Sequence, residues 1–158
     1  MHQFKVLVIL MFAVVYSGAA AADDTQEMAI AGSYLLTQDD KFLRVITFEP
    51  GGGIFQVSDQ QTLIGFSGGQ GTWRQSAPDT VSARVIDFSF DKKTGKRIGP
   101  SVLTYEFKFS DQKSGKFQSV TGSFSGVTYP AGDNPLRPAK KPVTKFSIGF
   151  KGERIGVE

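Results

Sequence analysis

The feature that most constrains this fold is a repeated alternation of strand-like runs and turn residues. From residue 31 to residue 152, runs of about 6–12 residues rich in β-branched and aromatic side chains alternate with clusters of Gly, Pro, Asp and Lys. No segment in this region has the periodicity of a long helix. The runs predict eight strands, at residues 31–37, 41–49, 53–58, 64–75, 79–90, 101–109, 116–129 and 142–152.

Most of these runs are joined by short turns. Gly and Asp mark hairpins at residues 50–53, 77–79, 91–95 and 111–115. The longest loop, residues 130–142, holds four prolines and is expected to cross one end of the fold. Because consecutive short hairpins place neighbouring strands antiparallel, the sequence predicts an all-β fold, an antiparallel eight-stranded up-and-down β-barrel. Closing the sheet into a barrel removes its unpaired edges.

Period-two alternation indicates which side chains share a face of each strand. In the run 101–109, one face carries Leu103, Tyr105, Phe107 and Phe109. In the run 42–48, one face carries Phe42, Arg44, Ile46 and Phe48. In the run 79–90, Asp87 shares a face with Val81, Ala83 and Val85, and Phe88 lies on the other face. The interior of an eight-stranded barrel is either filled by such side chains or holds one small ligand.

Residues 1–22 have the pattern of a secretory signal peptide. Lys5 precedes an apolar core at residues 6–16, and small residues follow at 17–22. The core is shorter than the roughly 20 apolar residues of a membrane-spanning helix. We therefore expect cleavage near Ala22, a secreted or periplasmic protein with no integral membrane span, and a single barrel domain at residues 23–158.

The chain has no Cys, and its one His, His2, lies in the predicted signal peptide. This composition excludes Ser–His–Asp and Cys–His catalysis and any zinc site built on His or Cys. We assign no catalytic residues and expect no metal and no cofactor. Because no side chain with an ordinary pKa near neutrality remains, we also expect little change in stability or ligand binding between about pH 6 and pH 8.

Charge is unevenly distributed along the chain. Residues 23–91 carry 4 bases and 10 acids, whereas residues 92–158 carry 13 bases and 5 acids. One interpretation is a basic face for an acidic partner or a membrane surface. We favour solvated lysines in separate turns, because no dense basic run occurs, and we expect no nucleic acid partner because aromatic residues do not alternate with bases on an exposed strand.

Two short patterns resemble the calycin-type barrels, the lipocalins and their bacterial lipocalin-like relatives. Gly32-Ser33-Tyr34 opens the first strand where lipocalins have Gly-x-Trp, and Arg154 follows the last strand, where a lipocalin arginine packs over that ring. Gly71-Thr72-Trp73 with the Asp-Phe-x-Phe-Asp pattern at residues 87–91 is similar to small secreted bacterial proteins of unknown role. The shape also resembles the allene oxide cyclase barrel. The resemblance implies a lipocalin-like barrel that binds a small ligand.

Five residues are candidate ligand contacts: Trp73, Asp87, Phe88, Tyr105 and Phe107. The phenylalanines at positions 42, 48, 88, 107 and 109 would line the cavity, unless they form a packed core. For Trp73 and Tyr105 we favour core packing over contact with a ligand. Asp87 needs a partner if it is buried, and we favour an orientation toward solvent or toward an arginine on a neighbouring strand.

Three functions are compatible with these patterns. The favoured one is an exported barrel that binds a small, mostly apolar molecule in an aromatic-lined cavity. The second is a cyclase or isomerase that uses Asp87 or Glu106 as acid and base, with Tyr105 nearby. The third is a small outer-membrane barrel, and a structural or protein-binding role is the remaining alternative. The sequence does not identify the ligand or the oligomeric state.

Overall fold

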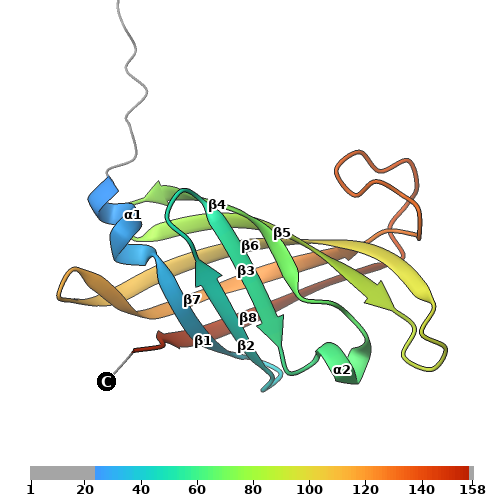
Figure 1. The fold of residues 1–158 in the computed structure, drawn as a ribbon, viewed down its shortest axis with the longest axis horizontal. Helices are drawn as coiled ribbons and strands as arrows, with labels where there is room; N and C mark the ends of the chain where they lie inside the picture. Colours follow the sequence, from blue (N-terminus) through green and yellow to red (C-terminus); the bar gives the residue numbers. More distant parts are fainter. Residues whose placement is uncertain (1–23, 157–158) are drawn as a thin grey trace, which may run out of the picture.

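The computed structural model describes residues 24–156, so the predicted signal peptide and His2 lie outside the described part of the chain. Eight antiparallel strands form a closed barrel, in which each strand pairs with the next and β1 pairs with β8 (Figure 1). The strands are β1 (Gly32–Gln38), β2 (Leu43–Phe48), β3 (Gly53–Ser58), β4 (Gly69–Ala77), β5 (Thr80–Phe90), β6 (Arg97–Lys113), β7 (Lys116–Thr128) and β8 (Thr144–Arg154). The predicted all-β, antiparallel, up-and-down barrel is confirmed.

The largest departure from the predicted strands lies between β3 and β4. A strand is expected from residue 64, but the chain forms a short helix, α2 (Gln61–Ile64), and enters β4 only at Gly69. Gly65 ends α2 with a φ of 77°, a left-handed conformation that glycine adopts at little cost. Phe66 then forms an isolated bridge with Ser89 of β5. Residues 61–66 therefore turn across one end of the barrel instead of lengthening its wall.

A second helix, α1 (Asp24–Ile30), lies at the opposite end of the barrel (Figure 1). Ala29 and Ile30 are buried there. The guanidinium of Arg154 fixes α1 by donating hydrogen bonds to the carbonyl oxygens of Ala29, at 2.8 Å, and Ala31, at 3.0 Å. Its Nε donates to the carbonyl oxygen of Phe117 on β7, at 2.6 Å. We call this the closed end of the barrel. The sequence does not predict α1, since seven residues are too few for a helical apolar pattern.

Aromatic side chains fill the barrel from the closed end to its middle. The Phe48 ring makes edge-to-face contacts with the rings of Tyr34, Trp73, Phe107 and Phe109, at centroid distances of 5.0–5.9 Å. The rings of Tyr105 and Phe107 are stacked at 5.2 Å. Phe48, Phe107 and Phe109 are therefore packed core, which is the alternative that the sequence left open for them, and they do not line the cavity. Their burial follows from the alternation in the sequence, but the closeness of their packing does not.

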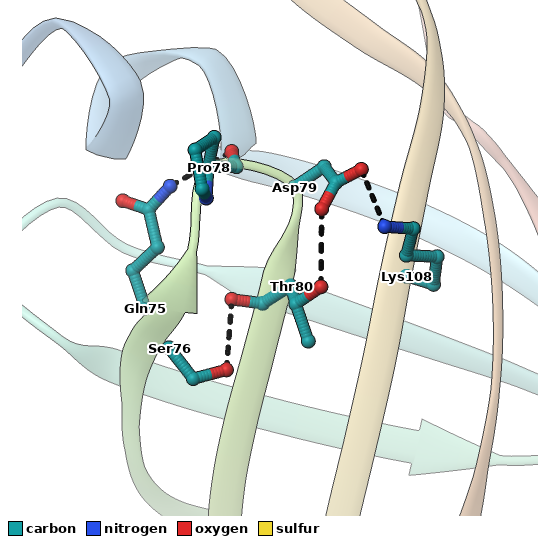
Figure 2. Close-up of polar contacts among 6 residues, drawn as sticks. All are labelled: Gln75, Ser76, Pro78, Asp79, Thr80 and Lys108. Atoms are coloured by element: carbon teal, nitrogen blue, oxygen red, sulfur yellow. Dashed lines mark hydrogen bonds and ion pairs between the residues drawn. The ribbon is translucent and has the colours of Figure 1, made fainter.

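The turn between β4 and β5 shows how a predicted hairpin is fixed by its own side chains (Figure 2). The amide of Gln75 donates to the carbonyl oxygen of Pro78, at 2.8 Å, and the hydroxyl of Ser76 donates to the carbonyl oxygen of Thr80, at 3.3 Å. Asp79 forms an ion pair of 2.6 Å with Lys108 on β6. The ion pair connects the turn to β6, and the hydrogen bond from Lys108 lowers the pKa of the Asp79 carboxyl.

Candidate functional site

The barrel contains a cavity of about 270 Å³ at the end opposite α1. We call the opening of this cavity the mouth. Apolar lining is contributed by Ile64, Phe66, Leu103, Phe124, Phe146 and Ile148. Polar lining is contributed by Asp40, Arg44, Gln60, Asp87, Ser89, Ser101 and Thr128. Three of these polar residues are of charged types. Asp40 is exposed, but Arg44 and Asp87 are each only 4% exposed, so the cavity holds two ionisable groups that have little access to water.

Arg44 reaches the cavity from β2, on the inward face that it shares with Ile46 and Phe48. Its Nη1 donates to Gln56 Oε1, at 2.6 Å, and to the Tyr105 hydroxyl, at 3.2 Å. Its Nη2 makes a longer contact of 3.4 Å with Gln38 Oε1. The guanidinium carbon lies 4.8 Å from the centroid of the Phe124 ring, which adds a cation–π contact. Its Nε has no hydrogen-bond partner. Arg44 is thus a buried cation held by neutral groups, with one donor left over.

Asp87 enters the same cavity from β5. Burial raises the pKa of its carboxyl to about 6, although a hydrogen bond from Ser101 and the charge of Arg44 both act to lower it. The Ser101 hydroxyl is itself linked to the hydroxyls of Ser89, at 3.0 Å, and Thr128, at 2.8 Å. Asp87 Oδ1 has no partner. Asp87 as a whole is only 4% exposed, so the expectation that it reaches solvent is wrong. The arginine whose charge acts on it is Arg44 of β2, not an arginine on a strand next to β5.

A polar layer, formed by the side-chain amides of Gln38 and Gln56 and the hydroxyl of Tyr105, separates the cavity from the aromatic core. The Tyr105 hydroxyl donates to Gln56 Oε1, and burial raises the pKa of this hydroxyl well above its usual value. Among the buried side chains of residues 24–156, four atoms lack a hydrogen-bond partner: Gln38 Nε2, Arg44 Nε, Gln56 Nε2 and Asp87 Oδ1. All four belong to this layer or to the cavity above it. Buried polar atoms without partners are uncommon in folded proteins, and beside a cavity such atoms are free to bond water or a ligand.

The structure separates the five candidate ligand contacts. Asp87 lines the cavity, and Tyr105 lies below it, joined to the lining residue Arg44. Phe107 and Trp73 lie in the packed core, where Trp73 Nε1 donates to the carbonyl oxygen of Glu49 at 3.0 Å. Phe88 is 45% exposed and does not line the cavity. Its assignment as a ligand contact is wrong, because strand alternation turns it away from the face that carries Asp87.

Several lining residues were not identified from the sequence. Arg44 was the detectable one, since a charged residue on an otherwise apolar strand face is unusual. Phe146 could not be found in this way, because its ring needs space provided by another strand. A Cβ added to Gly126 of β7 would lie 2.1 Å from that ring, so the glycine leaves the volume that Phe146 occupies. Phe66 depends on α2, which the sequence analysis did not predict.

Glu106, the other candidate acid, lies outside the barrel. Its carboxylate is exposed and accepts a hydrogen bond of 2.9 Å from Ser82. Within residues 24–156, no group of three or more Asp, Glu, His or Cys side chains is placed to hold a metal ion. The same residues include no helix long and apolar enough to cross a membrane. The chemistry of the site therefore rests on the buried carboxyl of Asp87, the buried guanidinium of Arg44, a group of hydroxyls and the exposed carboxyl of Asp40.

No family model, curated protein or solved structure matches this chain.

Proposed function

We propose that the barrel binds one small amphipathic molecule in the cavity at its mouth. The observation that carries this proposal is the pair of buried residues, Arg44 and Asp87, which both line the cavity and each leave one polar atom without a partner. Arg44 Nε can donate a hydrogen bond and Asp87 Oδ1 can accept one. A ligand with a hydroxyl or a protonated carboxyl could satisfy both, since each group combines a donor and an acceptor.

The rest of the lining supports a mostly apolar body for this ligand. The rings of Phe66, Phe124 and Phe146 and the side chains of Leu103 and Ile148 surround the polar pair. A volume of about 270 Å³ is close to the lower limit of ordinary ligand cavities, so the bound part of the ligand is small. Burial of apolar surface provides affinity, and the two polar contacts determine orientation.

Native mass spectrometry of protein purified from its own cell envelope tests the proposal directly, because a retained ligand adds mass. Calorimetric titration with octanoic acid and a panel of fatty acids, sterols and quinones should then give saturation near one molecule per chain. Arg44→Met and Asp87→Leu should each weaken binding about 10- to 100-fold, as expected when a buried hydrogen bond to a charged group is lost. Glu106→Gln, on the outer wall, is the matched control and should bind normally.

The proposal fails if every compound in the panel fails to saturate well-folded protein and no mass is retained. It also fails if the two cavity variants bind with unchanged affinity. Unfolding by urea should be followed for each variant, so that lost binding is not confused with lost structure.

Export is part of the same proposal, and it is supported by the apolar core and small-residue region of residues 1–22. The protein would then meet its ligand outside the inner membrane. N-terminal sequencing of the native protein should find a first residue at or near Asp23. Recovery of an intact Met1 would contradict export with cleavage.

The raised pKa of Asp87 supports a second candidate function, proton transfer to or from a bound substrate. A carboxyl with a pKa of about 6 inside a cavity can exchange protons near neutral pH. This function requires Asp87→Asn to abolish turnover while substrate still binds. Simple ligand binding requires no chemical change in the molecule recovered from the protein, and mass spectrometry distinguishes the two.

A further inference from the structure

Two basic loops lie at the same end of the barrel. The first consists of residues 91–97, the hairpin between β5 and β6 with the first residue of β6. The second consists of residues 129–145, the loop between β7 and β8 with the first two residues of β8. Both extend from the end that also carries α2 (Figure 1). Together they contain two acids and eight bases, the latter being Lys92, Lys93, Lys96, Arg97, Arg137, Lys140, Lys141 and Lys145. Bases that the sequence places in separate turns are thus brought to one end by the fold.

The two acids of these loops are engaged by their own backbone. Asp91 Oδ1 accepts hydrogen bonds from the amide and the hydroxyl of Thr94, at 2.8 and 2.9 Å. Asp133 accepts from the amides of Ala139 and Lys140, both at 3.1 Å. Within residues 24–156, none of the eight bases forms an ion pair with a side chain. Their charges are therefore available to a partner, and they outnumber the exposed carboxyl of Asp40, which lines the cavity at the same end.

Exposed apolar side chains accompany the bases. Seven large hydrophobic residues of these loops, of α2 and of the adjoining strand ends are 39–60% exposed: Leu63, Ile64, Phe88, Ile98, Leu136, Val143 and Phe146. Two of them, Ile64 and Phe146, also line the cavity, so the apolar surface continues from the exterior into the binding site. Clustered exposed hydrophobic residues of this kind mark interaction surfaces.

We propose that the mouth docks onto the surface of an anionic lipid bilayer. The eight bases match the negative headgroups, and the exposed apolar side chains match the boundary between headgroups and acyl chains. A nucleic acid or an acidic protein would use the charges but would leave Leu63, Ile64 and Phe146 without an apolar partner. The docked cavity would open toward the lipid. This proposal goes beyond ligand binding and does not depend on it.

Vesicle sedimentation tests the docking surface. The protein isolated from expressing cells, with its first residue determined so that all variants share one N-terminus, is mixed with vesicles of equal parts phosphatidylglycerol and phosphatidylcholine. Vesicles of phosphatidylcholine alone are the lipid control. We expect binding to the anionic vesicles that weakens as salt is added, and much weaker binding to the neutral ones.

Paired variants locate the surface. Lys93→Glu with Lys141→Glu at the mouth should weaken binding to anionic vesicles about thirtyfold or more, from the loss of two bases each worth about fivefold. Lys113→Glu with Lys151→Glu, which removes the same charge elsewhere on the exposed surface, is the control and should have a small effect. The first pair should still bind octanoic acid as the unchanged protein does, which separates failure of docking from failure of the cavity.

Apolar variants distinguish a bilayer from other acidic partners. Leu63→Ser with Val143→Ser should weaken vesicle binding at least about fivefold, whereas Met28→Ser with Ile155→Ser, exposed to a similar extent at the closed end, should not. Equal effects of the mouth and control pairs would overturn the proposal, and so would equal binding to both kinds of vesicle. Loss of binding from the charge variants alone, with the apolar variants unchanged, would overturn a lipid bilayer as the partner.

Discussion

The guanidinium of Arg154 lies over the ring of Tyr34, with its central carbon 4.7 Å from the ring centroid. The Tyr34 hydroxyl accepts a hydrogen bond from this guanidinium and donates one of 3.0 Å to the carbonyl oxygen of Ile30. Burial raises the pKa of Tyr34 to about 12, so the hydroxyl stays neutral at ordinary pH. The resemblance to lipocalins implies an arginine packed over this ring. The contact is a general one between a guanidinium and an aromatic ring, and by itself it does not assign a family.

Arg154→Ala should destabilise the protein by about 2 kcal/mol, because α1 loses its hydrogen bonds to the barrel and Tyr34 loses its cation–π partner. Urea unfolding measures this change. Arg84→Ala, on the exposed outer face of β5, is the control and should stay within about 0.5 kcal/mol of the unchanged protein. Equal stability of the two variants would show that Arg154 does not hold α1.

Asp87 makes stability depend on pH. Its pKa is raised from 3.8 to about 6, so the folded protein keeps a proton that the unfolded chain releases. The free energy of unfolding contributed by this group therefore falls as pH rises from about 4 through about 6, by about 3 kcal/mol in total, and levels off near about pH 7. Asp87→Asn removes this dependence and should be the more stable protein at pH 7. Unfolding of both proteins across this range measures the difference, and parallel curves would contradict the raised pKa.

Trp73 should not report ligand binding. Its ring packs against Phe48 at 5.7 Å in the aromatic core and does not line the cavity. Octanoic acid or any other bound ligand should therefore leave the emission of Trp73 nearly unchanged. A Phe66→Trp substitution places an indole in the cavity wall, and its emission should shift on binding. Strong quenching of Trp73 in the unchanged protein would place the ligand deeper than the cavity described above.

Gly126→Ala should cost about 1–3 kcal/mol and alter the cavity, since the added methyl group would lie 2.1 Å from the ring of Phe146. Because Phe146 lines the cavity, affinity for octanoic acid should also change. Ser125→Ala is the matched control, as it removes only an exposed hydroxyl from the same strand. If both variants have the stability and affinity of the unchanged protein, the Phe146 ring does not occupy this space.

The strands and their inward faces could be predicted because alternation is local. The inward side chains of β6, Leu103, Tyr105, Phe107 and Phe109, are all buried as the pattern indicates. The division of the interior into core and cavity depends on which layers meet across the barrel, and a pattern along one strand does not contain that information. Arg44 and Asp87 are 43 residues apart in sequence and meet only through closure of the sheet. Their shared site could therefore not be predicted from either strand alone.

The expectation of little pH dependence between about pH 6 and pH 8 assumed ordinary pKa values. The raised pKa of Asp87, about 6, places part of its titration at the lower edge of that range. A composition without Cys and with only His2 excludes groups that titrate near neutrality by nature, but it cannot show which carboxyl the fold will bury.

The arrangement of α1 and the end of β8 has a practical consequence. Asp24 begins α1 and Arg154 ends β8, and both elements lie at the closed end, opposite the mouth (Figure 1). A sensor chip or affinity tag attached beyond either of these points would hold the molecule by its closed end. The mouth would then face the sample solution, where it is accessible to vesicles or small molecules delivered in flow.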